Sequence, residues 1–258
     1  MLAVISPAKT LDYETTPPAV KLSEPLFPEA AAELVDTMRR YSPSDLQALM
    51  GISEKLAVQN AERFSHWQWP FPEGEARAAL FAFKGDVYAG LDAYNLDRES
   101  IAYLEDHLRI LSGLYGVLRP TDEMLPYRLE MGKKVTTGKG DDLYQFWGAR
   151  LAEHVQQAAA GHRDSTVVNL ASEEYFRSLK PHLKDVSVVT PVFKDWKNGR
   201  YKIISFFAKK ARGMMVRYMA EHKIESVENL KRFDFGGYTY DESSSTADEW
   251  VFLRKQEA

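Results

Sequence analysis

The sequence has 258 residues, of which 45% are hydrophobic and 27% charged, and its formal net charge is −4. No apolar run approaches the roughly 20 residues of a membrane helix, the N-terminus does not resemble a signal peptide, and the absence of cysteine excludes disulfides and thiolate chemistry. We therefore expect a cytoplasmic protein that does not bind nucleic acid over its whole surface.

Hydrophobic periodicity and turn residues predict short elements of both kinds in the first part of the chain. In order, we expect a strand over 2–6, extended chain over 14–28, a helix over 29–41, two short helices within 43–62 and a packed loop over 66–72. A strand over 80–83, then a loop or turn at 84–86 before Val87-Tyr88, and a helix over 95–108 follow. The prolines between 14 and 28 favour extended surface chain there.

The second part of the chain continues the alternation. We expect a strand over 110–112, a helix over 141–160, a strand over 167–170, a helix over 171–179, strands over 186–193 and 201–206, a helix over 206–221 and a strand over 251–253. Asn198-Gly199 predicts the hairpin turn between the two central strands. Because strands and helices follow no strict βαβ rhythm, we predict a single α+β or mixed α/β domain over 1–258.

The common catalytic and nucleotide-binding signatures are absent. Neither Gly-x-Gly-x-x-Gly nor Gly-x-Ser-x-Gly occurs, and residues 132–140 resemble a P-loop with the wrong spacing. The histidines never pair at metal-ligand spacing. We therefore assign no catalytic residue, no metal and no cofactor from the sequence, and leave open whether the protein is an enzyme.

Residues 42–60 have the pattern of a helix–hairpin–helix. Ser42 can cap a helix that ends at Gly51, and a second helix can begin after Ser53. In DNA-binding examples the turn presents backbone N–H groups to a phosphate. The candidate contacts are Gly51, Ile52, Ser53 and Lys55. The alternative is an ordinary helical hairpin, which Ser53 in place of a second glycine and the charge of Glu54 favour.

Residues 194–217 hold the strongest local charge, with eight Lys or Arg residues and one Asp in a chain of net −4. On a helical wheel Lys209, Lys210 and Arg212 lie opposite an apolar stripe. This basic side is either a solvated face or a surface that binds a polyanion. Gly213 permits close packing or the close approach of a ligand.

Two further segments carry candidate anion-binding side chains. Residues 114–134 combine Arg119 and Arg128 with tyrosines and turn residues, and the alternative is a set of structural ion pairs. Lys9 follows the first predicted strand, where a lysine can bind phosphate or, if desolvated, act as an amine nucleophile. The alternative for Lys9 is an ordinary surface lysine.

Six motifs together resemble the YaaA family of bacterial peroxide-stress proteins, and the likeness runs from residue 2 to about 254. They are ISPAKTLD (5–12), FKGDVY (83–88), LSGLYGVLRP (111–120), PYRLEMG (126–132), NLASEEYF (169–176) and ISFFAKKARG (204–213). The resemblance implies a cytoplasmic protein that supports survival under hydrogen peroxide, with less free iron and less DNA damage. It also implies a mixed α/β fold unlike the common superfolds, and it attaches no firm enzymatic activity.

The resemblance further implies double-stranded DNA as the partner, bound by a helix–hairpin–helix and a positively charged cleft. The hairpin corresponds to residues 46–60. The cleft corresponds to Lys9, Arg119, Arg128, Lys209, Lys210 and Arg212. We expect no membrane and no protein partner.

Three functions follow as hypotheses. The first is a DNA-binding peroxide-stress protein with little sequence specificity, held by phosphate contacts. The alternative is an enzyme acting on a nucleic acid or a phosphorylated small molecule, with Lys9 as amine nucleophile or phosphate clamp. The third is an iron-sequestering protein, which without cysteine or clustered histidine would need Asp and Glu oxygens as ligands.

Overall fold

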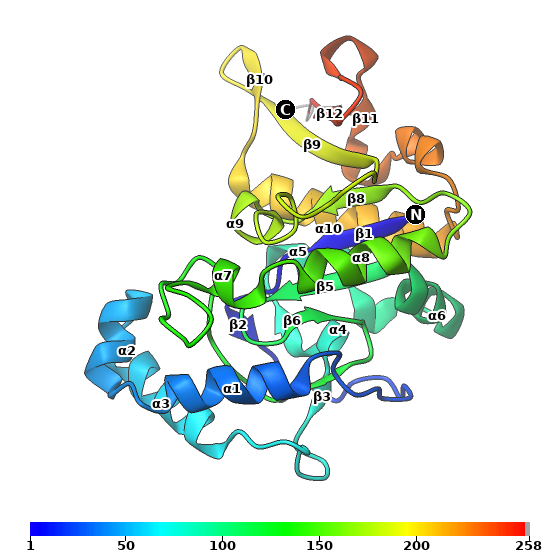
Figure 1. Ribbon diagram of the computed structural model, residues 1–258. Coiled ribbons are helices and arrows are strands. Elements are labelled where there is room, and N and C mark those ends of the chain that lie inside the picture. The colour runs from blue at the N-terminus through cyan, green and yellow to red at the C-terminus, as the bar shows by residue number, and fades with distance from the viewer. Residues whose placement is uncertain (256–258) are drawn as a thin grey trace.

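Strand β1 (Leu2–Ile5) lies inside the main sheet of the computed structural model, which describes residues 1–255 (Figure 1). It pairs in parallel with β5 (Leu108–Ser112) on one side and with β8 (Val167–Leu170) on the other. All residues of these three strands are buried. Apolar runs such as LAVI are typical of parallel strands that are covered on both faces.

The sheet continues outward from this parallel centre in the order β11-β12-β9-β8-β1-β5-β6. The remaining strands of the sheet are β6 (Gly116–Leu118), β9 (Val188–Lys197), β10 (Arg200–Lys202), β11 (Thr239–Tyr240) and β12 (Glu249–Arg254). Strand β9 is parallel to β8 and β12, and β10 folds back on β9. Asn198 and Gly199 both have positive φ, which confirms the predicted hairpin turn.

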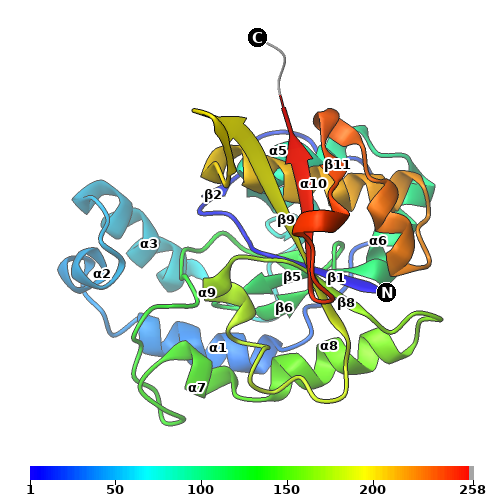
Figure 2. The ribbon, with the colours of Figure 1, turned by 90° about the horizontal axis from the view of Figure 1, so that it is seen from above.

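Helices cover both faces of the sheet. The α-helices of the described residues are α1 (Pro28–Met38), α2 (Pro43–Met50), α3 (Glu54–His66), α4 (Ala79–Ala82), α5 (Asp86–Leu91), α6 (Arg98–His107), α7 (Leu143–Trp147), α8 (Arg150–Ala160), α9 (Glu173–Phe176) and α10 (Ser205–Glu221), of which α2 and α3 lie beside the body of the molecule (Figures 1 and 2). In Figure 2, α8 lies on one side of the central strands, and α5, α6 and α10 lie on the other. Within residues 1–255 no helix combines the length and the apolar composition that crossing a membrane requires.

Short strand pairs outside the main sheet hold the loops around it. Strand β2 (Thr10–Leu11) pairs with β4 (Phe83–Lys84), and β3 (Arg77–Ala78) pairs with β7 (Glu123–Met124). The β2–β4 pair brings the loop after β1 beside the loop before α5. Two sequence motifs that are far apart in the chain therefore meet.

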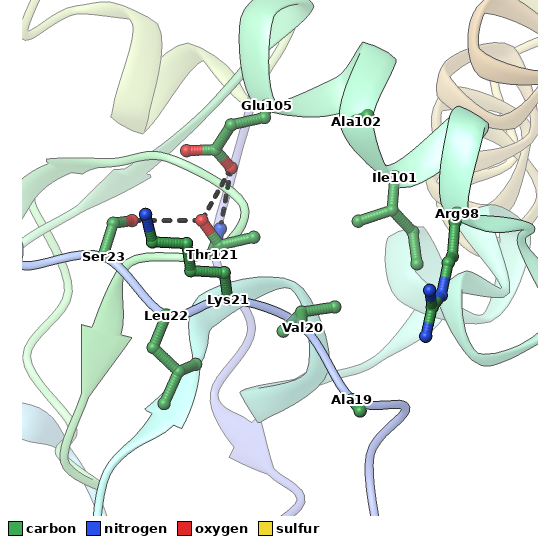
Figure 3. Close-up of a pocket in the computed structure, with 10 residues that line it drawn as sticks. All are labelled: Ala19, Val20, Lys21, Leu22, Ser23, Arg98, Ile101, Ala102, Glu105 and Thr121. Atoms are coloured by element: carbon green, nitrogen blue, oxygen red, sulfur yellow. Dashed lines mark hydrogen bonds between the residues drawn. The ribbon is translucent and has the colours of Figure 1, made fainter.

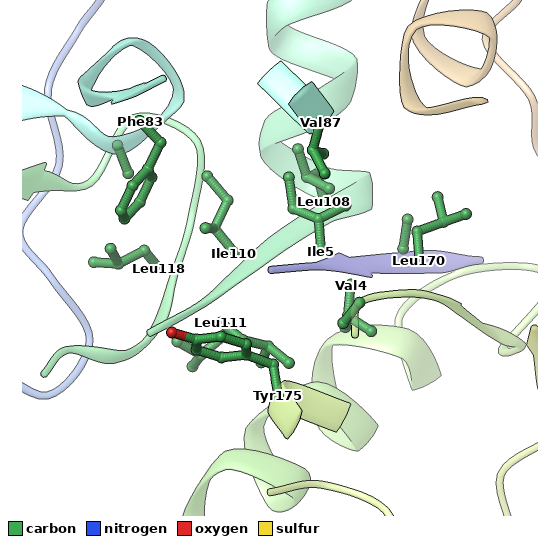
Figure 4. Close-up of a cluster of buried hydrophobic side chains, with 14 of the residues drawn as sticks. Val4, Ile5, Phe83, Val87, Leu108, Ile110, Leu111, Leu118, Leu170 and Tyr175 are labelled. Atoms are coloured by element: carbon green, nitrogen blue, oxygen red, sulfur yellow. The ribbon is translucent and has the colours of Figure 1, made fainter. Parts of the chain in front are cut away.

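The core lies on both faces of the central strands (Figure 4). Val4 and Ile5 are neighbours on β1 and point to opposite faces, as the period of a strand requires. Val4 points toward Tyr175 at the end of α9, and Ile5 points toward Val87 of α5. The sheet thus has no face left for solvent at this point, which fixes the ends of β1 and β8 in place.

Helices α5 and α10 cross in direct backbone contact. A Cβ on Gly213 would lie 1.8 Å from the carbonyl oxygen of Val87, and a Cβ on Gly90 would lie 2.0 Å from that of Lys210. Only glycine fits at either position. Of the two reasons that the sequence suggested for Gly213, the structure supports close helix packing.

The predicted mixed α/β fold is confirmed, but the region 79–91 differs from the prediction. Instead of a strand over 80–83 followed by a loop or turn, the chain forms α4, the short strand β4 and then α5. All four residues of α4 are buried. A short apolar run that is buried all round has no period that separates a helix from a strand.

Other boundaries differ as well. The strand predicted over 201–206 is only β10, because Ser205 already begins α10. The helix predicted over 141–160 is divided into α7 and α8 because Gly148 adopts φ 53° and ψ −135°, which no helix contains. The helix predicted over 171–179 contains regular α-helix only in α9. Strand β11 was not predicted, because two residues are too few to show the alternation of polar and apolar side chains that marks a strand.

A candidate anion-binding cavity and a basic hairpin

A cavity of about 430 Å³ lies at the carboxyl ends of β1 and β8. Its walls come from the loop after β1, the β4–α5 junction, residues 127–130, the segment after β8 and the start of α10. Strand β1 lies between β5, the next strand of the sheet along the chain, and β8, which follows later and lies on the other side of β1. In open α/β sheets, ligands bind outside the carboxyl ends of strands at such a switch point.

Hydroxyl groups at the strand ends form the floor of this cavity. The backbone N–H of Ser172 donates to Ser6 Oγ at 2.8 Å, and Ser6 Oγ donates to Ser172 Oγ at 3.2 Å. The Tyr88 hydroxyl donates to the Ser6 carbonyl at 3.1 Å. Ser112, at the end of β5, shares a 2.6 Å hydrogen bond with the Tyr127 hydroxyl. These contacts fix the tyrosine rings that face the cavity.

Glu130 is the most buried charged side chain of the cavity, with 5% of its surface exposed. Its Oε1 accepts from Arg128 Nη2 at 3.2 Å and lies 3.3 Å from Lys9 Nζ. Its Oε2 has no hydrogen-bond partner among residues 1–255. Lys9 and Arg128 are therefore already paired. Because the Lys9 side chain is also 66% exposed, it lacks the desolvation that an amine nucleophile needs.

Arg212 differs from these paired cations. It lines the same cavity from α10 and is partly buried, yet it makes no ion pair and no side-chain hydrogen bond within the described part of the chain. Burial lowers the pKa of its guanidinium. Lys209, one turn earlier and exposed, also lines the cavity. The α10 wall thus presents two cations without carboxylate partners.

The structure does not bring the other two predicted cleft cations to the cavity. Arg119 lies elsewhere, with Nη2 2.8 Å from Asp122 Oδ1 and 2.8 Å from the Glu24 carbonyl oxygen. Arg119 thus connects the turn at Asp122 to the extended segment at Glu24, which agrees with the alternative interpretation of a structural ion pair. Lys210 is exposed on α10 but does not line the cavity.

A second cavity, of about 610 Å³, contains none of the predicted site residues (Figure 3). It lies between residues 19–23 and helix α6. Thr121 donates from its hydroxyl to Glu105 Oε2 at 2.9 Å and shares a 3.0 Å hydrogen bond with Ser23. Lys21 and Arg98 also line this cavity (Figure 3), and most of its other walls are apolar. None of the six sequence motifs contributes a residue to it.

The two helices predicted within 43–62 are present as α2 and α3. Ser42 caps α2 in a reciprocal capping box with Asp45, and Gly51 ends it in the left-handed conformation. Ser53 caps α3 through the N–H of Leu56. This pair of helices lies at a separate end of the molecule from β10 and α10 in both ribbon views (Figures 1 and 2). Contact between this turn and DNA stays a prediction.

The β9–β10 hairpin carries exposed aromatic and aliphatic side chains that sequence reasoning did not select. Trp196 and Tyr201 pack on each other with ring centroids 5.0 Å apart. Ile203 and Phe206, which follow β10, are 59% and 55% exposed. The sequence feature that could have identified these side chains is their position among the cations Lys197, Arg200, Lys202 and Lys209. Figure 1 shows this hairpin projecting beyond the body of the molecule.

Comparison with known proteins decides the family. The sequence model described as "Peroxide stress protein YaaA" matches residues 1–244. The chain belongs to the YaaA family. UPF0246 proteins of Saccharophagus degradans and Alteromonas mediterranea are 52% identical over 256 residues and 51% identical over 258 residues. These alignments cover 99% and 100% of this chain, and all of each relative.

A third relative, a UPF0246 protein of Azoarcus sp., is 51% identical over 262 residues and is matched over its full length. The predicted resemblance to the YaaA family is therefore confirmed. The family motifs also have a common location. Segments 5–12, 83–88, 126–132, 169–176 and 204–213 all contribute residues to the cavity at the ends of β1 and β8.

Proposed function

We propose that this YaaA family protein acts in the cytoplasm during peroxide stress, binds double-stranded DNA with little sequence specificity, and so limits oxidative DNA damage. One observation carries the proposal. Seven cations between residues 194 and 212 make no ion pair within residues 1–255, whereas Lys9, Arg119 and Arg128 are all paired. We call the seven the basic surface: Lys194, Lys197, Arg200, Lys202, Lys209, Lys210 and Arg212.

Unpaired cations are what phosphate binding requires. Each one can neutralise a phosphate and release a counterion without first breaking an ion pair in the protein. Such contacts fix a protein on the duplex but do not read its sequence. Four residues of the basic surface lie on the projecting β9–β10 hairpin, and Lys209, Lys210 and Arg212 lie on α10. A β-ribbon has the dimensions to enter a major groove. Trp196 and Tyr201 add apolar contact area on the same hairpin.

The α2–α3 hairpin is the second proposed contact. Its turn, from Gly51 to Lys55, is mostly exposed. Glu54 opposes an approaching phosphate there, so we assign the main share of affinity to the basic surface. The two contacts are tested separately because they lie at separate ends of the molecule.

The test is fluorescence anisotropy of a labelled duplex across a salt series. We expect Lys209→Glu/Lys210→Glu to weaken binding and to flatten the log–log salt slope by about 1.8, which corresponds to two lost phosphate contacts. Arg98→Glu/Arg163→Glu is the matched control, because it changes the net charge equally at exposed positions outside the basic surface. Unchanged affinity and slope in the first variant would overturn the assignment of the basic surface.

The alternative function, an enzyme acting on a nucleic acid or a phosphorylated small molecule, is supported by the cavity. The ion pair with Glu130 favours Lys9 as a clamp over Lys9 as a nucleophile. Borohydride trapping on an abasic duplex tests the nucleophile, and a covalent adduct lost in Lys9→Met would establish it. No group of three or more His, Asp or Glu side chains in residues 1–255 is placed to hold a metal. The expected lowering of free iron therefore has no assigned residues.

A further inference from the structure

The cavity combines groups that a simple polyanion groove would not contain. Alongside its cations it is lined by the carboxylates of Asp86, Glu130 and Glu174. A bare phosphate would be repelled by these groups. A ligand that suits the cavity must bring both an acidic group and hydrogen-bond donors, and its size must fit about 430 Å³, which is within the range of small-molecule sites.

The acidic group has a defined receptor. Arg212 is held by the close crossing of α5 and α10 and has no partner in residues 1–255, so its planar guanidinium is free to bind an oxyanion with two hydrogen bonds. Lys209 lies one turn away on the same helix and lines the same cavity. A phosphate placed here would meet two cations that no protein carboxylate occupies.

The hydrogen-bond donors of the ligand also have receptors. Glu130 is 5% exposed and its Oε2 lacks a donor in the described residues, although its Oε1 is bound by Arg128 and Lys9. A buried acceptor without a donor destabilises the protein, and a ligand N–H would satisfy it. Asp86 lines the cavity without any ion pair or side-chain hydrogen bond in residues 1–255, so it can accept from ligand hydroxyl groups.

The walls between these receptors are aromatic. Tyr88, Tyr127 and Tyr175 line the cavity, and the hydroxyls of Tyr88 and Tyr127 are held by Ser6 and Ser112. Fixed aromatic rings favour a flat ligand ring by stacking. A phosphate, vicinal hydroxyls and a flat ring with N–H donors describe one chemical class.

We propose that this cavity binds a nucleotide unit, with its phosphate on Arg212 and Lys209, its sugar hydroxyls toward Asp86, and the N–H edge of its base toward Glu130 among the tyrosines. The site shares Lys209 and Arg212 with the basic surface, but nucleotide binding in the cavity does not require the DNA binding proposed above. The same unit can reach the cavity as a free nucleoside monophosphate or as a single nucleotide turned out of a DNA duplex. In the second case the deoxyribose has no free hydroxyl group, so the contact with Asp86 is lost and the phosphate and base contacts hold the nucleotide.

The first experiment is isothermal titration calorimetry of the full chain with AMP, GMP, CMP and UMP, with guanosine and inorganic phosphate as reference ligands. We expect at least one nucleotide to bind more tightly than guanosine and inorganic phosphate. Arg212→Met should weaken nucleotide binding at least tenfold while leaving guanosine binding within twofold, because it removes only the phosphate receptor. Arg163→Met, at an exposed position outside the cavity, is the control. Thermal unfolding of each variant confirms that it is folded.

The second experiment separates the two sources. The bound nucleotide is titrated against a duplex with one unpaired base and against the fully paired duplex. Competition by the first duplex alone supports a nucleotide turned out of DNA, and competition by neither supports a free nucleotide. No binding of any of the four nucleotides at millimolar concentration would overturn the site. Equal affinity for inorganic phosphate, or unchanged nucleotide binding in Arg212→Met, would do the same.

Discussion

Gly213 of α10 lies directly on the backbone of Val87 in α5, and a Cβ at Gly213 would be 1.8 Å from the Val87 carbonyl oxygen. This contact sets the position of α10 against the sheet. Arg212 precedes Gly213, and Asp86 precedes Val87, so the same contact places a cation and a carboxylate at the cavity. The packing of two helices and the layout of the candidate site therefore have one cause.

We expect Gly213→Ala to lower the free energy of unfolding by about 3 kcal/mol, because the added methyl group must push two backbones apart. Urea denaturation monitored by circular dichroism measures it. Gly138→Ala is the control, since a Cβ at this exposed position meets nothing within 4 Å. Its effect should stay within about 0.5 kcal/mol. A Gly213→Ala variant as stable as the control would show that α5 and α10 separate easily.

The base of the β9–β10 hairpin is held by a buried ion pair. Arg254 Nε donates to Asp195 Oδ1 at 2.6 Å, and the Tyr238 hydroxyl donates to Asp195 Oδ2 at 2.9 Å. We expect Asp195→Ala to destabilise the protein by about 3–5 kcal/mol, because it leaves a buried guanidinium without its counter-charge. Urea denaturation tests this beside Asp36→Ala, which breaks an exposed pair with Arg39 and should cost less than about 1 kcal/mol. Equal costs would contradict the interpretation.

Stability should fall in mild acid through His154. Arg109 Nε donates to His154 Nε2 at 3.3 Å, and burial together with the charges of Arg109 and Arg119 lowers the pKa of His154 to about 4. The unfolded chain, with a pKa near 6.5, binds a proton between pH 6.5 and 4 that the folded chain does not bind. The stabilising effect of neutral His154 is therefore complete above pH 6.5 and is lost as the pH falls toward 4.

The corresponding measurement is the urea midpoint at several values between pH 7 and pH 4. His154→Gln cannot take up the proton, so its midpoint should fall less steeply than that of the wild type. His107 and His162, whose pKa values burial also lowers, are present in both proteins and contribute equally. Parallel curves for the two proteins would exclude His154 as a source of the acid sensitivity.

The hairpin cations should contribute to DNA affinity independently of α10. Replacing Lys197, Arg200 and Lys202 with alanine should reduce the magnitude of the log–log salt slope by up to about 2.7, with the same loss on duplexes of unrelated sequence. Anisotropy on two such duplexes is the measurement. A loss confined to one sequence would show base contacts instead, and no loss would remove the hairpin from the DNA surface.

Local signals in the sequence were sufficient for much of the fold. The Ser42 cap, the left-handed Gly51 and the Asn198-Gly199 turn depend on neighbours a few residues away, and each appears as predicted. The prediction for residues 79–91 was wrong because α4 is buried on all sides and most of α5 is buried as well. That burial is set by strands and helices distant in the chain, which periodicity does not report.

The candidate site was predictable in its parts but not in its assembly. Lys9, Arg128, Lys209 and Arg212 were selected by residue type and do line one cavity. The sequence could not show that Glu130 neutralises two of them while Arg212 stays unpaired. Arg119 had the same composition signal as Arg128, yet Asp122, three residues later, holds it elsewhere. Charge can be read along a chain, but pairing depends on the fold.

The place of β1 in the sheet also governs when the protein can fold. Its partners β5 and β8 come at residues 108–112 and 167–170. At about 5–20 residues per second, synthesis makes β8 roughly 10–30 s after β1. During the last part of that interval LAVI can pair with β5, but the β8 side of β1 stays uncovered. Parallel pairing at this separation is slow to form, so this apolar strand is open to aggregation until β8 has been made.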